Sequence, residues 1–475
     1  MRLLFAASEA YPLIKTGGLA DVASGLPAAL AALGCDVRLI LPAYPQVLEG
    51  AEAKGQGLAL GDPLGTGETR LIPARMPDSG IDAWLVDCPP LYDREGGPYV
   101  DAKGNVWPDN HQRFALLSMA AALVCMNGAN GWHPDVVHAN DWHTGLIPLF
   151  LKRGKEAIPS VFTIHNIHYQ GLFERKVLEG VGLTRVDFTI DGVEYFGKVS
   201  YIKAGLQFSS RITTVSPTYA SELQGPEMGE GLDGLLSARA GVLKGILNGV
   251  DYALWNPAED RAIARDYSAS SLDVKVDNKR ALQREMGLEE RDEAPLLGMV
   301  SRFTHQKGID LLLDALDGIF SLGCQVAVLG SGEAKFEREL SAAADASPKR
   351  MAATIGYDEE LAHRIQAGAD MLLVPSRFEP CGLTQLYALK YGTLPVVRRT
   401  GGLADSVFDV SEGKAGTGFL FDGPTPEELL KAVRRGVELF GRPKDWHKVQ
   451  KTAMKQDFSW QKSAAAYMLL YKELV

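Results

Sequence analysis

The chain has 475 residues, of which 46% are hydrophobic and 23% charged, and its formal net charge is −10. This length predicts two domains, because a single hydrophobic core seldom holds so many residues. The negative charge argues against nucleic acid as a partner, since phosphate backbones favour basic surfaces. The five cysteines form no CxxC pair. Together with the absence of a signal-peptide pattern or an apolar run of membrane-spanning length, they lead us to expect a cytoplasmic protein with no membrane partner.

Short apolar runs alternate with helical patterns in the first half of the chain. A strand is expected at 2–7 (RLLFAA), then a helix at 19–33 that Gly34 closes. Further strands are expected at 36–42 (DVRLILP), 135–140 (DVVHAN), 160–166 (SVFTIHN) and 211–216 (RITTVS). This βαβ rhythm predicts a parallel sheet with helices on both faces. The glycine-rich stretches 55–67 and 225–234 are expected to be loops.

The composition changes at 247–260 (LNGVDYALWNPAED), a segment that is rich in turn-forming residues. A second βαβ series then begins at 295–302 (PLLGMVSR) and continues through 324–330, 371–376 and 394–399. We therefore expect two doubly wound α/β domains joined near residue 250. The expected boundaries are 1–247 for the first domain, 248–455 for the second and 456–475 for a C-terminal helix.

One phrase occurs twice, as KTGGLADV at 15–22 and as RTGGLADSV at 399–407. Each copy stands where a loop enters a helix, one copy in each expected domain. Helix N-termini attract negative charge, so both copies are candidates to bind an anionic ligand. The alternative is that the two glycines only permit a tight turn and close packing. For the second copy both interpretations remain open.

The segment 375–392 (PSRFEPCGLTQLYALKYG) follows an expected strand and precedes a helix. It lies where open α/β sheets bind ligands, at the carboxyl end of a strand. Gly382 would let the backbone approach a phosphate, and the N–H groups of Leu383 and Thr384 would bind it. Glu379 places a carboxylate in the same crevice, next to Cys381. We therefore expect a phosphate-binding loop with an acidic group beside it.

Segment 301–310 (SRFTHQKGID) stands at the end of the first strand of the second domain. Arg302 and Lys307 are five residues apart there, and two cations in this position would neutralise a diphosphate. The turn GSGE, which contains Gly332, is a weaker signal of the same kind.

Polar residues also end two strands of the first domain. HANDWH contains Asp141 and TIHNIHYQG contains His165 and Asn166, and together they indicate a polar pocket. A zinc site is a poor interpretation, because no cysteine or acidic ligand set converges on these histidines. The chain has no Asp-x-Asp pair, so no metal or other cofactor is expected. The aromatic side chains that are candidates to stack on sugar rings are Tyr92, Tyr99, Trp107, Trp142 and Tyr169.

These motifs, in this order, resemble those of bacterial glycogen synthases, which use ADP-glucose and are related to plant starch synthases. The resemblance runs from residue 2 to the closing SWQKSAAAY. It implies a GT-B fold, with two Rossmann-like domains facing a central cleft and a C-terminal helix that crosses back to the first domain. It also implies that ADP-glucose and a glycogen or α-1,4-glucan acceptor are the substrates.

Roles follow from the resemblance position by position. Arg302 and Lys307 match the pair that binds the phosphates, Glu379 the carboxylate on the transferred glucose, and His165 the histidine beside the reacting sugar. These four are the expected catalytic residues. Lys15 matches a lysine that binds ADP-glucose, Asp141 an acceptor-side acid, and Tyr357 is a candidate to stack on adenine. The expected substrate-binding residues are Lys15, Gly17, Gly18, Asp21, Asp141, Asn166, Asn248, Gly332, Tyr357, Cys381, Gly382, Leu383 and Thr384.

Two positions depart from the family pattern. Asn140 stands where relatives often have histidine. Tyr387 stands where the wider retaining GT-B pattern has a second glutamate, which leaves Gln385 as a candidate to hold the ribose.

The expected activity is retaining transfer of glucose from ADP-glucose to the non-reducing 4-hydroxyl of an α-1,4-glucan. The same transfer from UDP-glucose, a nucleotide-sugar epimerase or hydrolase on the same fold, and a non-catalytic glucan-binding protein are the alternatives. The sequence leaves the oligomeric state open.

Overall fold

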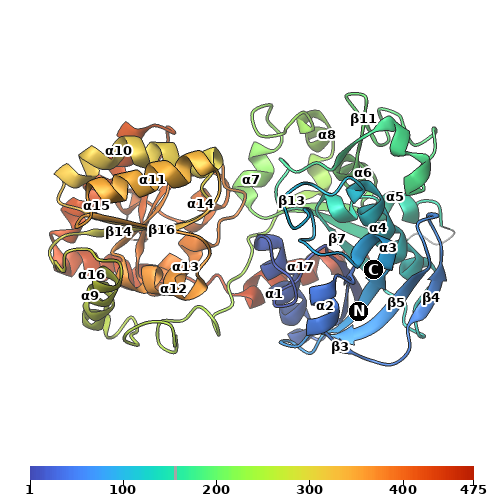
Figure 1. Cartoon of the computed structure of the whole chain (residues 1–475), viewed down its shortest axis with the longest axis horizontal. Coiled ribbons are helices and arrows are strands. Elements are labelled where there is room, and N and C mark those ends of the chain that lie inside the picture. The colour runs from blue at the N-terminus through green and yellow to red at the C-terminus, as the bar shows by residue number, and fades with distance from the viewer. Residues whose placement is uncertain (155–157, 414) are drawn as a thin grey trace. The chain divides into compact units, whose positions relative to one another are not determined.

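The computed structural model describes residues 1–154, 158–413 and 415–475. The chain forms two compact units (Figure 1). The first comprises Met1–Gly249 and Trp460–Val475, and the second comprises Val250–Ser459. Within the described part of the chain, every helix is too short or too polar to cross a membrane.

A ten-stranded sheet forms the core of the first unit, in the order β13-β12-β8-β7-β1-β2-β6-β5-β3, with β4 paired to β5. Its parallel strands are β13 (Leu243–Gly245), β12 (Arg211–Thr214), β8 (Ser160–Ile164), β7 (Val136–Asn140), β1 (Arg2–Ala6), β2 (Asp36–Pro42) and β6 (Asp82–Asp87). An antiparallel edge follows, made of β5 (Thr69–Arg75), β3 (Glu52–Ala53) and β4 (Leu58–Gly61). The predicted parallel sheet is therefore present, and it carries an antiparallel edge that the sequence analysis did not predict. The stretch 55–67, expected to be a loop, contains β4.

Helices and a small second sheet complete the first unit. The α-helices are α1 (Gly18–Ala32), α2 (Pro45–Gly50), α3 (Pro89–Tyr92), α4 (Asn110–Asn127), α5 (Ile147–Leu151), α6 (Tyr201–Phe208), α7 (Pro217–Glu222), α8 (Asp233–Ala238) and α17 (Trp460–Lys472). Short 3-10 helices are η1 (Trp142–Thr144), η2 (Arg175–Val177), η3 (Glu179–Val181) and η4 (Ala240–Val242). The small antiparallel sheet consists of β10 (Glu194–Tyr195), β11 (Lys198–Ser200) and β9 (Leu172–Glu174).

The second unit contains a six-stranded parallel sheet in the order β16-β15-β14-β17-β18-β19. The strands are β14 (Leu296–Val300), β15 (Gln325–Gly330), β16 (Met351–Ile355), β17 (Met371–Val374), β18 (Leu394–Arg398) and β19 (Phe419–Phe421). In chain order this is 3-2-1-4-5-6, the doubly wound arrangement, whose ligand site lies where the order reverses. That point is the carboxyl end of β14 and β17.

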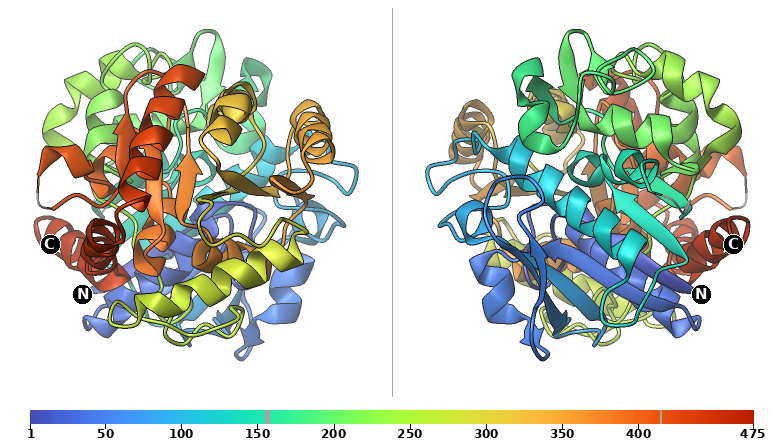
Figure 2. Two further views of the ribbon diagram at one scale, coloured as in Figure 1. Left: turned by 90° about the vertical axis from the view of Figure 1, so that its left-hand side faces the viewer. Right: turned by 90° about the vertical axis from the view of Figure 1, so that its right-hand side faces the viewer.

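Helices lie on both sides of this sheet, with α10 and α11 on one side and α12 and α13 on the other (Figure 1). Figure 2 shows the ribbon from two further sides. The α-helices are α9 (Lys275–Glu285), α10 (Ile309–Ser321), α11 (Ala334–Ala346), α12 (Glu359–Gly368), α13 (Thr384–Tyr391), α14 (Gly401–Ser406), α15 (Pro426–Phe440) and α16 (Pro443–Met454). Three 3-10 helices are η5 (Leu272–Val274), η6 (His305–Lys307) and η7 (Val410–Glu412).

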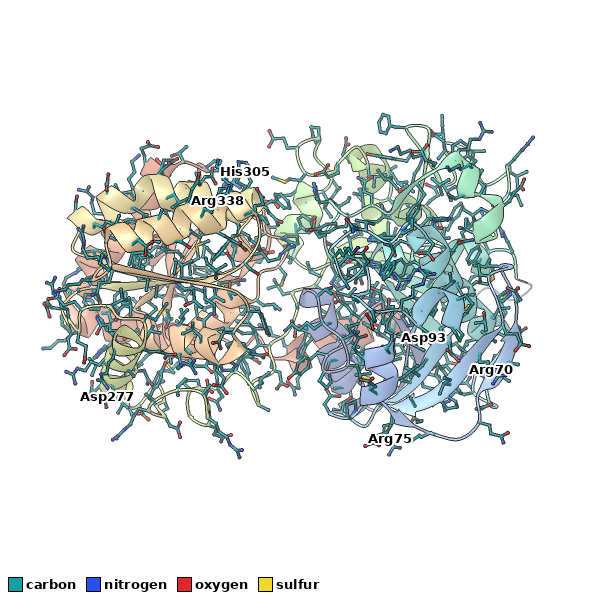
Figure 3. All side chains as sticks on the ribbon, viewed as in Figure 1. Arg70, Arg75, Asp93, Asp277, His305 and Arg338 are labelled. Atoms are coloured by element: carbon teal, nitrogen blue, oxygen red, sulfur yellow. The ribbon has the colours of Figure 1, made fainter. Side chains whose placement is uncertain are left out.

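Burial explains why the sequences of the central strands are continuous runs of apolar residues. Leu3, Leu4 and Phe5 of β1 are fully buried, as are Leu296 and Leu297 of β14, because helices cover both faces of each sheet. At the antiparallel edge, β5 contains buried, half-buried and exposed side chains instead. Arg70 and Arg75 of β5 point to solvent there (Figure 3).

The C-terminal helix α17 packs on α1 within the first unit. The Trp460 ring lies against Gly25 of α1 and against Gly249, the last residue before the second unit. The Ser463 hydroxyl donates to the Leu247 carbonyl at 2.7 Å, and the Tyr471 hydroxyl lies 2.7 Å from His138 Nδ1. The last turns of the chain are therefore part of the first unit's core.

Candidate active site

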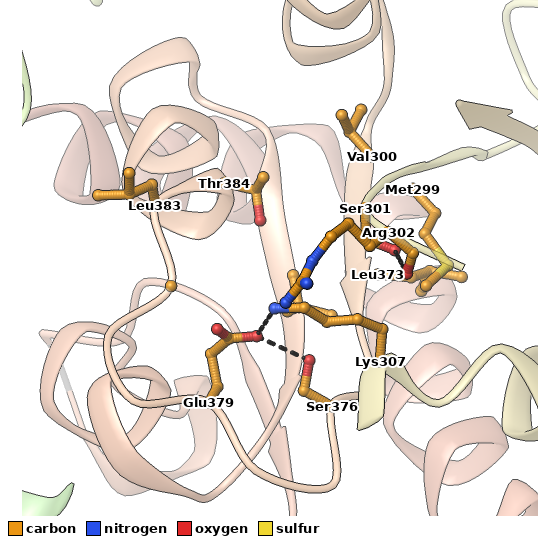
Figure 4. Close-up of a pocket in the computed structure, with 12 residues that line it drawn as sticks. Met299, Val300, Ser301, Arg302, Lys307, Leu373, Ser376, Glu379, Leu383 and Thr384 are labelled. Carbon is orange, nitrogen blue, oxygen red and sulfur yellow. Dashed lines mark hydrogen bonds and ion pairs between the residues drawn. The ribbon is translucent and has the colours of Figure 1, made fainter. Parts of the chain in front are cut away.

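A pocket in the second unit lies at the carboxyl ends of β14 and β17, where the strand order reverses. Residues from both strand ends and from the segment that opens α13 form its wall (Figure 4). The lining residues are Met299, Val300, Ser301, Arg302, Lys307, Leu373, Val374, Ser376, Glu379, Gly382, Leu383 and Thr384. The sheet topology thus brings together residues that are about 80 positions apart in the sequence.

A carboxylate and an ammonium group meet in this pocket. Lys307 Nζ lies 2.6 Å from Glu379 Oε2, and the side chains are 17% and 8% exposed. The Ser376 hydroxyl donates to the same oxygen at 2.9 Å. Among the described residues none donates to Glu379 Oε1. One carboxylate oxygen is therefore held in place and the other remains able to accept a hydrogen bond from a ligand.

Two cations face this pocket. Figure 4 shows the ends of Arg302 and Lys307 pointing into the same space beside Glu379. Lys307 is the last residue of η6, and Arg302 lies two residues after the end of β14. This pair suits a diphosphate, because positive charges in a partly dry pocket attract phosphate oxygens more strongly than charges in water do.

The loop before α13 supplies backbone donors to the pocket. Gly382 has φ of 71°, a left-handed conformation that glycine adopts without strain. Leu383 and Thr384 follow it at the start of an eight-residue helix, where the first N–H groups have no partner within the helix. The predicted phosphate loop therefore has the geometry of an anion site, with Cys381 buried beside it.

The second copy of the repeated phrase supports this loop from behind. The Gly402 N–H donates to the Glu379 carbonyl at 3.0 Å. A Cβ at Gly401 would lie 2.0 Å from that carbonyl oxygen, and one at Gly402 would lie 2.1 Å from the Cys381 carbonyl oxygen. Because the Gly402 N–H is already used, the structure favours close packing over anion binding for this copy. Arg399 binds Glu412 and Asp422.

Gln385 braces the same loop. Its side-chain amide donates to the carbonyls of Cys381 and Gly382 and to the Ser406 hydroxyl. The side chain is fully buried, which argues against the ribose-binding role considered for it.

Tyr387 belongs to a stack of three rings. The Trp255 ring lies parallel to Tyr387 at 3.9 Å and to His363 at 3.7 Å. His363 Nδ1 is 2.8 Å from Asp260 Oδ2, which also accepts the Tyr391 hydroxyl. Tyr387 lies in the first turn of α13, directly after the phosphate loop. The stack therefore attaches the irregular segment after residue 250 to the helix that opens at the pocket.

The remaining predicted residues of the second unit lie outside the pocket wall. Gly332 follows β15, where it pairs with Phe303 and donates its N–H to Glu337 Oε1 at 2.9 Å. Tyr357 follows β16, is 76% exposed and donates its hydroxyl to Glu359 at 2.8 Å. Both lie at carboxyl ends of strands in the β14 sheet.

In the first unit, Asp141 and His165 end neighbouring strands. The His165 N–H donates to Asp141 Oδ1 at 2.8 Å. Asn140 donates its amide to the Ala6 carbonyl, so its Oδ1 faces His165 Nε2 at 2.9 Å. This places the imidazole proton on Nε2 and makes Nδ1 an acceptor. The role of Asn140 is thus to orient His165.

Burial controls the charges of this group. It raises the pKa of the Asp141 carboxyl to about 7, although N–H groups of His165 and Asn166 act in the opposite direction. Burial also lowers the pKa of His165, so its imidazole is neutral at pH 7. Asn166 accepts the His168 N–H at 3.1 Å, and Asn248 is buried in the loop after β13.

The first copy of the repeated phrase surrounds a carboxylate that the sequence analysis missed. Glu9 is 2% exposed and accepts both the backbone N–H and the hydroxyl of Thr16 on Oε2. Burial raises its pKa. Lys15 binds Asp21 at 2.8 Å, and Gly17 and Gly18 start α1. Glu9 could have been found from the sequence because it lies just beyond β1. Ser376 could have been found in the same way because it lies just beyond β17.

One of the aromatic candidates is a core residue, and a second is half-buried. Tyr92 is 1% exposed and donates its hydroxyl to the Arg113 carbonyl, so it has no face for a sugar. Tyr99 is half-buried, with its hydroxyl 2.8 Å from Ser8 and its ring stacked on His143. Within the described ranges no group of three or more His, Cys, Asp or Glu side chains could hold a metal ion.

Replacing Asp141 by asparagine should reveal its raised pKa. Between the ordinary pKa of 3.8 and the folded value of about 7, the folded protein holds a proton that the unfolded chain releases. The free energy of unfolding therefore falls as the pH rises from about 4 through 7, because the buried carboxyl loses its proton less readily than the carboxyl of the unfolded chain. The stability of Asp141→Asn relative to wild type should therefore increase from pH 4 to 7 and then level off, in urea unfolding experiments. A difference that does not change with pH would contradict the raised pKa.

Removing the central ring of the stack should weaken binding of ADP, the nucleotide that the resemblance implies. Trp255→Ala should raise the calorimetric Kd about tenfold, because α13 loses its support, whereas Trp255→Phe keeps a stacking ring and should change it less than threefold. Trp446→Ala is the control, since Trp446 is also buried but is not part of the ring stack. If Trp255→Ala and Trp446→Ala both lower Tm and neither changes the Kd, the stack has no role in nucleotide binding.

Comparison with known families agrees with this geometry. Residues 2–238 match the model of the starch synthase catalytic domain, and residues 284–452 match that of the glycosyl transferases group 1. Glycogen synthase from Rhodospirillum rubrum is 50% identical over all of this chain and 99% of its own length. Glycogen synthase from Francisella tularensis subsp. novicida is 47% identical, again over all of this chain and 99% of its own.

Solved structures show the same fold. The catalytic domain of starch synthase IV from Arabidopsis thaliana, bound to ADP and acarbose, has a TM-score of 0.88 and 30% identity, covering 99% of each chain. Sucrose-phosphate synthase from Thermosynechococcus elongatus, at 17% identity and a TM-score of 0.62, shares the fold. The predicted fold class of two doubly wound domains is confirmed, and the chain belongs to the glycogen and starch synthase family of retaining GT-B glycosyltransferases.

Proposed function

We propose that this protein transfers glucose from ADP-glucose to the non-reducing 4-hydroxyl of an α-1,4-glucan, with retention of configuration. The observation that carries the proposal is the Arg302–Lys307–Glu379 group beside the N-terminus of α13. Two cations and backbone N–H groups suit a nucleoside diphosphate, and a carboxylate suits sugar hydroxyls. The similar starch synthase IV is bound to ADP and acarbose, which supports the same assignment for this chain.

Bond breaking in this reaction places negative charge on the departing ADP. The C1–O bond electrons pass to the β-phosphate oxygen, and Arg302, Lys307 and the first N–H groups of α13 stabilise them. The acceptor oxygen then bonds to C1 from the same face, next to the departing phosphate, which can take the hydroxyl proton. Glu379 contributes a negative charge near an oxocarbenium-like transition state.

Residues of the first unit are also proposed to bind the substrates. We assign Lys15 and the start of α1 to the phosphates, and Asp141 to the acceptor. His165, neutral at pH 7, can hydrogen-bond a sugar hydroxyl through Nδ1. We also propose a cytoplasmic location, which the five free and buried cysteines support.

Removing the charge of Glu379 should nearly abolish turnover. In Glu379→Gln the side chain keeps its size but loses the negative charge at the reacting sugar, so kcat should fall a hundredfold or more. The release of ADP from ADP-glucose with glycogen present is the measurement. Glu339→Gln, an exposed position on α11, is the matched control. Turnover of Glu379→Gln within about fivefold of wild type would refute the assigned role.

Metal chelation should leave turnover largely unchanged. Arg302 and Lys307 occupy the place in which other enzymes hold a divalent cation against a diphosphate. Initial rates after EDTA treatment and desalting should stay within about twofold of the untreated rate. Loss of activity that magnesium or manganese restores would show that the two side chains do not suffice.

A further inference from the structure

An arginine two residues before Glu379 does not line the pocket. Arg377 lies in the loop after β17, and its side chain is 22% exposed. The guanidinium binds Asp310 through two parallel hydrogen bonds, from Nη1 to Oδ1 at 2.8 Å and from Nη2 to Oδ2 at 2.7 Å. Nη1 also donates to the His305 carbonyl at 2.9 Å. Arg377 therefore joins the loop after β17 to the segment after β14.

The same two segments meet at further points. The Arg377 N–H donates to the Gln306 carbonyl at 2.8 Å, and the Gln306 side-chain amide donates to the Phe378 carbonyl at 3.2 Å. A Cβ at Gly308, which has φ of 69°, would lie 2.2 Å from the Pro375 carbonyl oxygen. The two backbones are therefore in direct contact. We call the contacts of Arg377 and Gln306 the loop clamp.

The loop clamp encloses the ion pair of the pocket. Lys307 directly follows Gln306 and lies three residues before Asp310, whereas Glu379 lies two residues after Arg377. Every clamp contact thus involves a residue within three positions of one partner of the ion pair. Because the lysine side chain is long and flexible, the 2.6 Å contact with the carboxylate depends on where the two backbones are held.

The Arg377–Asp310 pair constrains geometry as well as charge. Burial alone would raise the pKa of the Asp310 carboxyl, but the hydrogen bonds and charge of Arg377 lower it, so both groups are ionised at pH 7. Asp310 also lies in the first turn of α10, where the helix dipole stabilises a carboxylate. A lysine would keep the positive charge, but it lacks the planar fork that binds both carboxylate oxygens.

We propose that Arg377 is a positioning residue for glucose transfer, because its bond to Asp310 sets the separation of Lys307 and Glu379. This inference rests on the proposed function, which assigns Lys307 to the departing phosphate and Glu379 to the transferred glucose. The two groups act on opposite ends of the breaking C1–O bond, so their separation must match the transition state. A displacement of about 1 Å in such a site lowers the rate on the order of a hundredfold.

The variants Arg377→Gln and Arg377→Lys test this role. In both, kcat should fall tenfold or more, while the KM for ADP-glucose should change less than threefold, because Arg302 and the N–H groups of α13 remain in place. Asp310→Asn should have the same effect as Arg377→Gln. The double variant should be no worse than either single one, since all three remove the same pair.

Arg364→Gln is the matched control. Arg364 is 23% exposed and binds Glu285 at 2.9 Å, so its replacement also removes a half-buried ion pair of the second unit. Arg364 lies on α12 and does not line the pocket. Its kcat should stay within twofold of wild type, even if Tm falls as far as in Arg377→Gln.

Crystal structures of Arg377→Gln and Arg364→Gln supply a measurement that does not depend on turnover. In Arg377→Gln the distance from Lys307 Nζ to Glu379 Oε2 should exceed about 4 Å, the limit of an ion pair. In Arg364→Gln it should keep the wild-type value of 2.6 Å. If Arg377→Gln does not fold, Arg377→Lys, which retains the charge, takes its place in both measurements.

Three outcomes would overturn the inference. An unchanged contact between Lys307 and Glu379 in Arg377→Gln shows that the loop clamp does not set it. Equal losses of kcat in Arg377→Gln and Arg364→Gln assign the effect to stability alone. Additive losses in the double variant show that Arg377 and Asp310 do not act as a pair. Failure of the proposed function is a separate result, because wild type then transfers no glucose while the crystal structures still report on the clamp.

Discussion

The ion pair between Lys307 and Glu379 is the contact around which the second unit's pocket is built. A carboxylate at 8% exposure would be costly without a partner, because burial removes the water that stabilises its charge. Lys307 supplies the partner from η6 after β14, and Glu379 comes from the loop after β17. The pair is therefore possible only where these two strands lie side by side and parallel.

The loop that carries Glu379 is supported from three directions. Gly401 and Gly402 allow α14 to pack directly against its carbonyl groups, and Gln385 holds it from within. The Trp255 stack fixes the first turn of the helix that follows. Such support matters for an electrostatic site, since its donors must already be in place when charge develops on the ligand.

In the first unit, burial shifts the pKa values of the carboxyl groups. In the second unit, an ion pair stabilises the charge of the buried Glu379 carboxylate. Glu9 and Asp141 follow β1 and β7, the point where this sheet also reverses its strand order. Burial raises the pKa values of both carboxyl groups. A neutral His165, oriented by Asn140, completes this group. The two units thus offer different chemistry: buried hydrogen-bonding groups in the first, and the cations Arg302 and Lys307 in the second.

The sequence by itself determined the two βαβ series and marked Arg302, Lys307, Glu379 and the segment Gly382–Thr384 as candidates. Local patterns suffice for this, because an apolar strand and the residues just beyond its end are contiguous in the chain. That these residues line one pocket was decided by the pairing of β14 with β17. Only the tertiary structure decided the functions of Ser376, Glu9, Tyr387 and the second TGGLAD. Each of them acts through a neighbour that is distant in sequence or through close backbone packing, which periodicity does not encode. The edge strand β4 was missed for a related reason: a glycine-rich segment becomes a strand only when β5 supplies its hydrogen-bond partners.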